Sequence, residues 1–171
     1  FRSIVREIVP VIFALIFAGK IGSSIGAELG SMRVTEQIDA MEVSGTNPFK
    51  YLVVTRVLAT TFMLPVLIML GDAISLYGSW VGINIRGITS FDLFWTQVFN
   101  NLSFSDVLPA FFKCFFFGFV VGIIGCYKGF NSKKGTEGVG RSANSAVVIS
   151  SVMIFIIDLL AVQVTDVLGF N

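Results

Sequence analysis

Three ionisable side chains stand inside or at the edge of long apolar segments: Glu7, Lys113 and Asp158. A charged side chain at membrane depth costs roughly 2.5–3.5 kcal/mol on insertion scales, so it normally has a partner or lines a water-filled cavity. Two acids and one base on three separate segments can neutralise one another in part, or can line a polar chamber. A transport pathway is therefore the first hypothesis, and a buried structural ion pair between packed helices is the alternative.

The composition is that of a protein with several membrane-spanning helices. Of the 171 residues, 54% are hydrophobic and 13% are charged, and the mean hydropathy is +0.84. Soluble domains carry roughly 25% charged residues, so this chain falls outside their range. The net charge of +1 gives no electrostatic reason to expect nucleic acid as a partner.

The sequence contains no histidine, which is the commonest general base and the commonest metal ligand. The two cysteines, Cys114 and Cys126, lie on one expected helix. At 1.5 Å rise per residue they stand about 18 Å apart, which is too far for a disulfide between them. Neither has a metal-ligand pattern around it. We expect no metal site, no cofactor and no catalytic residue in this chain.

Four long apolar segments predict an all-α, polytopic transmembrane bundle. The expected membrane helices cover residues 4–32, 51–83, 107–127 and 146–168. A short helix over 35–43 and an amphipathic helix over 91–99 lie in two of the connections. We treat residues 1–171 as one transmembrane domain. Because the chain opens with Phe1 inside an expected helix, we expect it to be incomplete at its N-terminus.

Basic residues predict the orientation of the bundle. The connection 128–145 carries Lys128, Lys133, Lys134 and Arg141. The positive-inside rule places this connection in the cytoplasm. Alternation then puts the connection 33–50 in the cytoplasm as well, and the connection 86–106, with its amphipathic helix, on the outer side.

The three ionisable groups lie at similar depth in this arrangement. The markers chosen for the cytoplasmic interface are Lys20, Tyr127 and Ala146. Counted from them at 1.5 Å per residue, Glu7, Lys113 and Asp158 each lie about 18–21 Å toward the outer face. A common depth is necessary for a shared site, although it is not sufficient.

Glycines recur every four residues on two of the expected helices. Gly22, Gly26 and Gly30 share one face of the first helix, and Gly118 with Gly122 does the same on the third. Lipid supplies no hydrophobic drive between helices, so small residues that permit close backbone approach favour their association. The spacing predicts a packing seam on each helix. The alternative is that glycine is simply common in membrane helices.

The segment Gly135–Ser142, GTEGVGRS, is similar to a phosphate-binding P-loop with arginine in place of lysine. It connects two expected membrane helices and follows no parallel strand, so the strand–loop–helix context of a P-loop is missing. We therefore interpret it as a flexible, basic cytoplasmic turn and not as a nucleotide site.

The helix expected over 35–43 is amphipathic. Its apolar side carries Ile38 and Met41, and its acidic residues are Glu36, Asp39 and Glu42. Helices that lie on membranes are usually rich in Lys and Arg, so the acidic side favours docking into a groove of a partner protein. An ordinary exposed connector is the alternative.

The most specific segment runs from Ala18 to Val43, AGKIGSSIGAELGSMRVTEQIDAMEV. Together with Glu7–Pro10, Asn47–Pro48 and the EGVGR segment that precedes Asp158, it resembles the MlaE-type permease family. These permeases are the membrane subunits of MCE-associated ABC transporters, which move phospholipid between inner and outer membranes. The resemblance covers nearly the whole chain. The family's N-terminal interfacial helix and first membrane helix have no counterpart in these residues. Directly before Pro10, Ile8-Val9 replaces the Leu-Gly that is usual in the family.

The resemblance implies a homodimeric inner-membrane permease without enzymatic activity of its own, which contributes to outer-membrane lipid asymmetry. An MCE-domain protein would sit on the outer side, and phospholipid would occupy a cavity between the two copies, open to that side. Glu7, Lys113 and Asp158 align with polar positions of the cavity. A separate ATPase subunit would dock on the loop helix, here called the coupling helix. Its implied docking residues are Glu36, Gln37, Asp39, Met41 and Glu42.

Two other classes of function are compatible with an apolar chain of this kind. An ion- or proton-coupled secondary carrier would use Glu7 and Asp158 as titrating groups and would need no ATPase. Such carriers are built from inverted repeats, whereas this sequence shows no internal repeat and the acidic loop helix would have no role. The third class is a purely structural assembly subunit.

Overall fold

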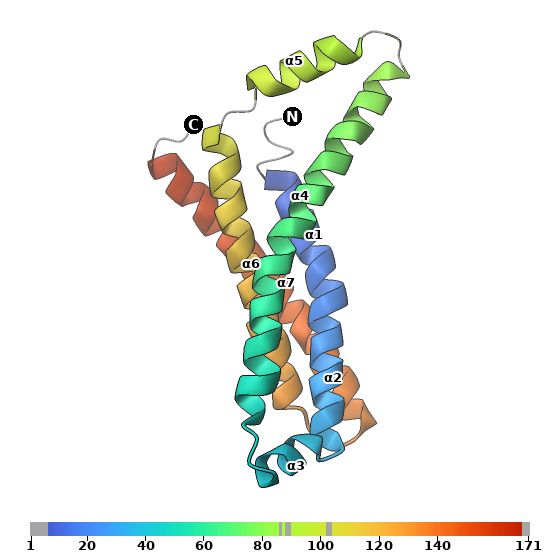
Figure 1. Cartoon of the computed structure of the whole chain (residues 1–171), viewed down its shortest axis with the longest axis vertical. Helices are drawn as coiled ribbons and strands as arrows, with labels where there is room; N and C mark the ends of the chain where they lie inside the picture. Colours follow the sequence, from blue (N-terminus) through green and yellow to red (C-terminus); the bar gives the residue numbers. More distant parts are fainter. Residues whose placement is uncertain (1–6, 86, 88–89, 102–103, 169–171) are drawn as a thin grey trace.

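The chain folds as a bundle of long helices in the computed structural model, which describes residues 7–85, 87, 90–101 and 104–168 (Figure 1). No strand occurs among these residues. Four helices are long and apolar enough to cross a membrane: Val9–Val34, Phe49–Asn84, Val107–Phe130 and Thr136–Val167. The expected all-α polytopic bundle is confirmed.

The first span consists of three consecutive helical parts. These are α1 (Val9–Phe17), the π-helical turn η2 (Ala18–Gly22) and α2 (Ser23–Val34). The residues at both junctions keep right-handed helical dihedral angles, so the three parts form one continuous span. The expected start at residue 4 lies outside the described residues.

The second span is the longest. It begins with the π-helical turn η3 (Phe49–Val54) and continues as α4 (Thr55–Asn84). The helix continues through Pro65, which is buried. At 1.5 Å per residue the span measures about 54 Å, well over the roughly 30 Å of a hydrocarbon core. Its far half diverges from α6 (Phe104–Phe130) toward the end of the bundle where α5 (Phe91–Asn101) lies (Figure 1).

The last span, α7 (Thr136–Val167), begins ten residues before the expected start at 146. The interpretation of Gly135–Ser142 as a flexible turn is therefore wrong, because all but its first residue belong to the helix. Gly135 has a φ of 102°, which ends the preceding loop. Glu137 in the first turn suits the positive end of the helix dipole. The polar composition of residues 136–145 therefore does not mark the end of the helix.

Helix α6 lies at the centre of the bundle. It packs on α4, α2 and α7. One buried apolar cluster lies in mid-bundle and includes Phe17, Leu64, Phe117, Val121 and Ile154. A second cluster joins Ile25 and Leu29 of α2 to Leu52 and Cys126 near the end where α3 (Gln37–Val43) lies. The helices α3 and α5 therefore mark opposite ends of the molecule (Figure 1).

The outer faces of α4 and α7 are apolar and exposed. Large side chains such as Phe62, Ile74, Phe155 and Leu159 are among them. Exposed apolar area on this scale indicates contact with lipid or with other membrane helices, since a soluble monomer rarely carries it.

Candidate functional site

The Lys113 ammonium of α6 and the Asp158 carboxylate of α7 form an ion pair in mid-bundle. Lys113 Nζ donates a hydrogen bond to Asp158 Oδ1 over 2.6 Å. The lysine side chain is only 6% exposed and the aspartate 23%. The ammonium also lies 5.9 Å from the ring centroid of Phe117, so an aromatic face adds to its stabilisation. Both charges are thus held by partners that the bundle itself supplies.

Glu7, two residues before the start of α1, lines a small cavity together with Lys113. The remaining lining residues are Pro109 and Ala110 of α6 and Ala161, Val162 and Thr165 of α7. The three ionisable residues singled out in the sequence are therefore gathered at one level of the bundle, from three different segments. The transport hypothesis and the structural ion-pair hypothesis both predict that these three groups lie close together, so their proximity does not separate the two.

Asp72 of α4 is a fourth ionisable group at membrane depth, and the sequence analysis missed it. Its Oδ1 atom is buried and has no hydrogen-bond partner among the described residues. Ile68, one turn before Asp72 on the same face of α4, packs in one buried cluster with Cys114, so this carboxylate lies close to the turn of α6 that carries Lys113. The signal was present in the sequence as a single acid inside the apolar run LIMLGDAISL.

The glycines of the first span face α6 and α7. A Cβ added at Gly26 would lie 3.3 Å from the Ala143 Cα, and one at Gly30 would lie 3.0 Å from the Ser142 Oγ. At Gly22 the nearest atom would be a methyl of Val121, at 3.3 Å. Ser142 Oγ donates a hydrogen bond to the Gly26 carbonyl over 3.2 Å. Such an approach of two backbones is what a seam of small residues permits.

The glycines of α6 lie against α4. A Cβ at Gly118 would lie 2.5 Å from the Thr60 carbonyl oxygen, and one at Gly122 would overlap the Thr60 hydroxyl. Neither position leaves room for a side chain unless the two helices separate. The two glycine series therefore lie on different interfaces of the bundle, α2 against α6 and α7, and α4 against α6.

The coupling helix α3 turns its apolar side toward its own chain. Ile38 is fully buried and belongs to the apolar cluster of Leu29, Leu52 and Cys126, and Met41 packs against that cluster. Met41 is half-buried, so it packs on this cluster with only part of its side chain. The helix begins one residue after Glu36, whose φ of 60° breaks it from α2. The expected helix 35–43 is thus shorter at its start.

The acidic side of α3 faces outward. Glu36, Gln37 and Glu42 are exposed. Asp39 is also exposed, and it accepts a 2.9 Å bond from Arg33 of α2. A second ion pair joins Arg56 of α4 to Glu28 of α2 over 2.7 Å. Two ion pairs and one buried anchor therefore fix this end of the bundle and present a carboxylate surface.

Comparison with known proteins places the chain among permeases. The family model described as Permease MlaE matches residues 1–164. The chain belongs to the MlaE permease family. The resemblance read from the segment Ala18–Val43 is thereby confirmed, and it extends over the spans that hold the ion pair and the glycine seams.

Curated relatives of this MlaE-family chain are named as transporter subunits. A probable ABC transporter permease protein of Rickettsia typhi is 43% identical over 155 residues, covering 90% of this chain and 60% of that protein. A probable ABC transporter permease protein of Synechocystis is 41% identical over 154 residues, covering 90% of this chain and 59% of that protein. The intermembrane phospholipid transport system permease protein MlaE of Haemophilus influenzae is 34% identical over 158 residues, covering 91% and 60%. The chain thus spans about three fifths of these relatives' length.

The cavity beside the ion pair of this MlaE-family chain is small, about 20 Å³. A cavity needs roughly 10–15 Å³ to hold one water molecule, so this space holds about one water and no lipid. Among the described residues, no group of three or more His, Cys, Asp or Glu side chains is placed to hold a metal ion. Both cysteines are free and buried.

Proposed function

We propose that this chain forms most of the permease subunit of an ABC transporter that moves phospholipid between inner and outer membranes. The observation that carries the proposal is the MlaE family match over residues 1–164, together with the phospholipid-transport name of the Haemophilus relative. The chain would contribute the membrane path, and ATP hydrolysis would take place in a separate partner subunit. Its four candidate spans fit a multi-pass protein of the inner membrane.

The acidic surface of α3 is the proposed docking site for the ATPase. Ile38 is buried and Asp39 bonds Arg33 of α2, so these contacts attach the helix to the spans and would transmit a push on α3 to α2. Glu36 and Glu42 remain exposed for basic residues of the partner. Charge pairs at such an interface contribute orientation and association rate as much as affinity. Attachment through Ile38 and Asp39, with Glu36 and Glu42 in no ion pair of the described residues, is what a coupling element requires.

The lipid would be held between two copies of the permease. One chain alone offers about 20 Å³ beside Lys113, far below the several hundred Å³ of ordinary ligand sites. The exposed apolar faces of α4 and α7 supply surface for a second copy and for acyl chains. An MCE-domain protein on the outer side, at the α5 end, would receive the lipid.

Lys113 is the proposed contact for the lipid phosphate. An ammonium is a compact point charge, and charge-assisted bonds to phosphate oxygens are strong. Glu7 and Asp158 would balance this charge when no lipid is bound, as the 2.6 Å ion pair with Asp158 illustrates. The conformational change driven by ATP would then exchange a carboxylate partner for a phosphate partner.

A proton-coupled secondary carrier is the second candidate, and one observation favours it. Asp72 carries a buried carboxylate oxygen without a hydrogen-bond partner in the described part of the chain, and buried acids of this kind serve as proton carriers in membranes. That reading leaves the anchored acidic helix α3 without a role. Co-purification separates the two candidates.

The experiment is to tag the full-length permease and purify it from its native membrane in mild detergent. A nucleotide-binding subunit in stoichiometric amount is the expected result, with ATP-dependent lipid exchange after reconstitution. A permease that purifies without any nucleotide-binding subunit, and whose transport follows a proton gradient, would contradict the proposal and support the carrier.

A further inference from the structure

A second and much larger cavity lies at the end of the bundle where α6 passes into α7. Its volume is about 430 Å³. The lining comes from the end of α6, the loop and the first three turns of α7, and comprises Lys128, Asn131, Ser132, Lys133, Lys134, Glu137, Gly138, Arg141, Ser142 and Ser145. We call it the basic pocket. None of these residues takes part in the ion pair of the bundle or in the coupling helix.

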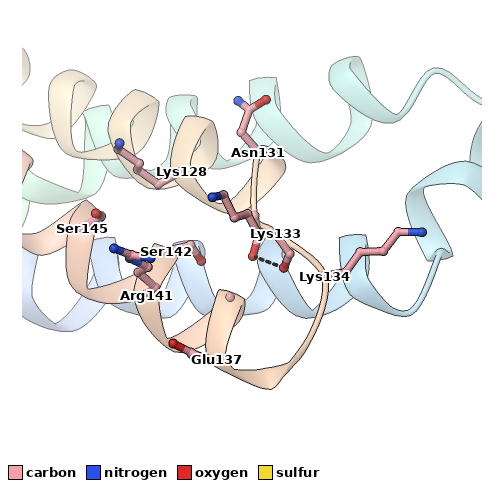
Figure 2. Close-up of a pocket in the computed structure, with 10 residues that line it drawn as sticks. Lys128, Asn131, Lys133, Lys134, Glu137, Arg141, Ser142 and Ser145 are labelled. Atoms are coloured by element: carbon pink, nitrogen blue, oxygen red, sulfur yellow. Dashed lines mark hydrogen bonds between the residues drawn. The ribbon is translucent and has the colours of Figure 1, made fainter.

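The basic pocket holds an excess of positive charge. Four of its side chains are cationic and one, Glu137, is anionic. In the described part of the chain, no ion pair includes any of the four cations. Figure 2 shows the charged ends of Lys128, Lys133 and Arg141 on one side of the pocket, with Lys134 extended away from them. Cations gathered without carboxylate partners indicate a site for an anion that is not part of this chain.

Hydroxyl groups add neutral donors to the same side. Ser145 lies next to Arg141 in Figure 2, one turn further along α7, and its hydroxyl enters no hydrogen bond of the described residues. Ser142, in contrast, is buried and bonds the carbonyls of Gly26 and Val139. The free hydroxyl beside a guanidinium is a combination that binds phosphate oxygens, since Arg presents a planar fork of donors.

The face of α7 that leads away from the pocket changes from charged to apolar. Arg141, Ser145, Val148 and Val152 follow one another at helical spacing on that face. Val148 and Val152 are 55% and 53% exposed. At 1.5 Å per residue, Val148 lies about 10 Å further toward the membrane centre than Arg141. The sequence of cation, hydroxyl and exposed valine matches the profile of a phospholipid, with its phosphate outermost and its acyl chains along the helix.

We propose that the basic pocket binds the headgroup of an anionic phospholipid of the cytoplasmic leaflet. The phosphate contacts Lys128, Lys133 and Arg141, Ser145 donates to it, and the acyl chains lie along Val148 and Val152. Basic pockets between membrane helices on the cytoplasmic side are suited to acidic headgroups. The site lies at the other end of the bundle from the α5 end, so it is distinct from the proposed transport cavity and does not depend on it.

A nucleotide site is a poorer explanation of the same residues. The glycines that would have to cradle phosphates in a P-loop, Gly138 and Gly140, lie within α7, where helical backbone leaves no loop to wrap an anion. A Cβ at Gly138 would also overlap the Lys133 carbonyl, so the loop closes directly over the start of the helix. An acidic protein surface would satisfy the cations but would leave the exposed valines unexplained.

The test uses the full-length permease in its native complex, reconstituted in nanodiscs of phosphatidylcholine with a trace of photoactivatable phosphatidylglycerol. The measured quantity is the crosslinked fraction on peptides covering 128–152, for the unaltered protein, Arg141→Gln, and Lys128→Gln with Lys133→Gln. The matched control is Lys50→Gln, an exposed lysine at the same end of the bundle that does not line the pocket. Retention of the partner subunits is measured on every variant, so that a folding failure is recognised.

Labelling is expected to fall about tenfold in Arg141→Gln and further in the double variant, because each removes charge-assisted phosphate contacts. Lys50→Gln should label as the unaltered protein does. Unlabelled phosphatidylglycerol should compete, and phosphatidylcholine should not. Three results would overturn the proposal: labelling that the pocket variants leave unchanged, displacement by millimolar inorganic phosphate as effective as by lipid, or loss of a partner subunit from the pocket variants with labelling intact. The second would assign the pocket to free phosphate and the third to an acidic protein.

Discussion

Lys113 and Asp158 approach within 2.6 Å across the interface of α6 and α7, and this contact neutralises the charge that α6 carries into the bundle. The lysine is the more deeply buried partner. Removal of Lys113 alone leaves the Asp158 carboxylate in a low-dielectric setting without this counter-charge, whereas removal of Asp158 leaves Lys113 beside Glu7. Single substitutions at this pair therefore mix two effects, loss of a structural contact and loss of a chemical function, and only a double substitution separates them.

The first prediction concerns that separation. Lys113→Met alone should destabilise the bundle by about 3–5 kcal/mol, because the Asp158 carboxylate remains uncompensated. Asp158→Leu should cost less, because Glu7 still lines the cavity beside Lys113. The double variant should recover assembly and thermal stability, since apolar replacement of a buried pair is often neutral or stabilising by about 1–4 kcal/mol. Lipid transport should still be lost in the double variant, because the phosphate contact is gone. Thermal midpoints in detergent and a reconstituted lipid-exchange assay measure the two properties.

The control for this prediction is an ion pair between two other membrane-spanning helices. Arg56 and Glu28 pair over 2.7 Å between α4 and α2, far from the cavity. Arg56→Met with Glu28→Leu should fold and should transport lipid. A double variant at Lys113 and Asp158 that transports as well as this control would show that the buried pair is structural only.

The second prediction concerns the close contact of α2 with α7. Gly26→Leu should prevent assembly, because a Cβ there already lies 3.3 Å from the Ala143 backbone and the remaining side-chain atoms have no space. Gly19→Leu is the matched control in the same span, since a Cβ at that position meets nothing within 4 Å. Size-exclusion profiles of the two variants measure the difference. Equal, normal profiles would mean that α2 and α7 are not held together through this face.

The architecture was predictable because membrane helices are encoded by residue type and length. Apolar runs predicted the four spans, and 1.5 Å per residue placed Glu7, Lys113 and Asp158 at one level, where the structure brings them together. The start of α7 was not predictable in this way. Hydropathy marks the apolar part of a segment, whereas Thr136–Ser145 is polar and still helical. The helix begins directly after Gly135, whose positive φ ends the preceding loop.

Two features of the candidate site needed three-dimensional information. The amphipathic pattern of α3 predicted an apolar and an acidic side, but a pattern cannot tell whether the apolar side meets a partner or its own chain. Ile38 is buried against Leu29 and Leu52, which settles that question. The sequence shows Asp72 as a lone acid in an apolar run. Its position near the turn of α6 that carries Lys113 depends on how α4 packs on α6.

The third prediction concerns coupling through α3. Glu36→Lys with Glu42→Lys should abolish ATP-driven transport while the permease still inserts and dimerises, because these carboxylates are exposed and make no ion pair among the described residues. Asp39 is left unchanged, since its bond to Arg33 holds the helix in place. Ser44→Lys with Thr46→Lys adds positive charge to the same loop outside the helix and should retain activity. Co-purification of the ATPase with each variant is the measurement, and full retention by the α3 variant would contradict the docking role.

The last prediction concerns Asp72. Its Oδ1 atom is buried without a hydrogen-bond partner in the described part of the chain, and an unsatisfied buried acceptor typically costs about 1–3 kcal/mol, more if charged. Asp72→Asn keeps the shape and removes the charge, so the thermal midpoint should stay the same or rise. If the carboxylate serves only to polarise the turn of α6 that carries Lys113, ATP-driven lipid exchange should continue at a reduced rate. If it carries protons for a coupled transporter, lipid exchange driven by a proton gradient should stop. A marked fall in the thermal midpoint would contradict the assignment of an unpartnered carboxylate, because it would show that Asp72 makes a stabilising ionic contact within the assembled protein.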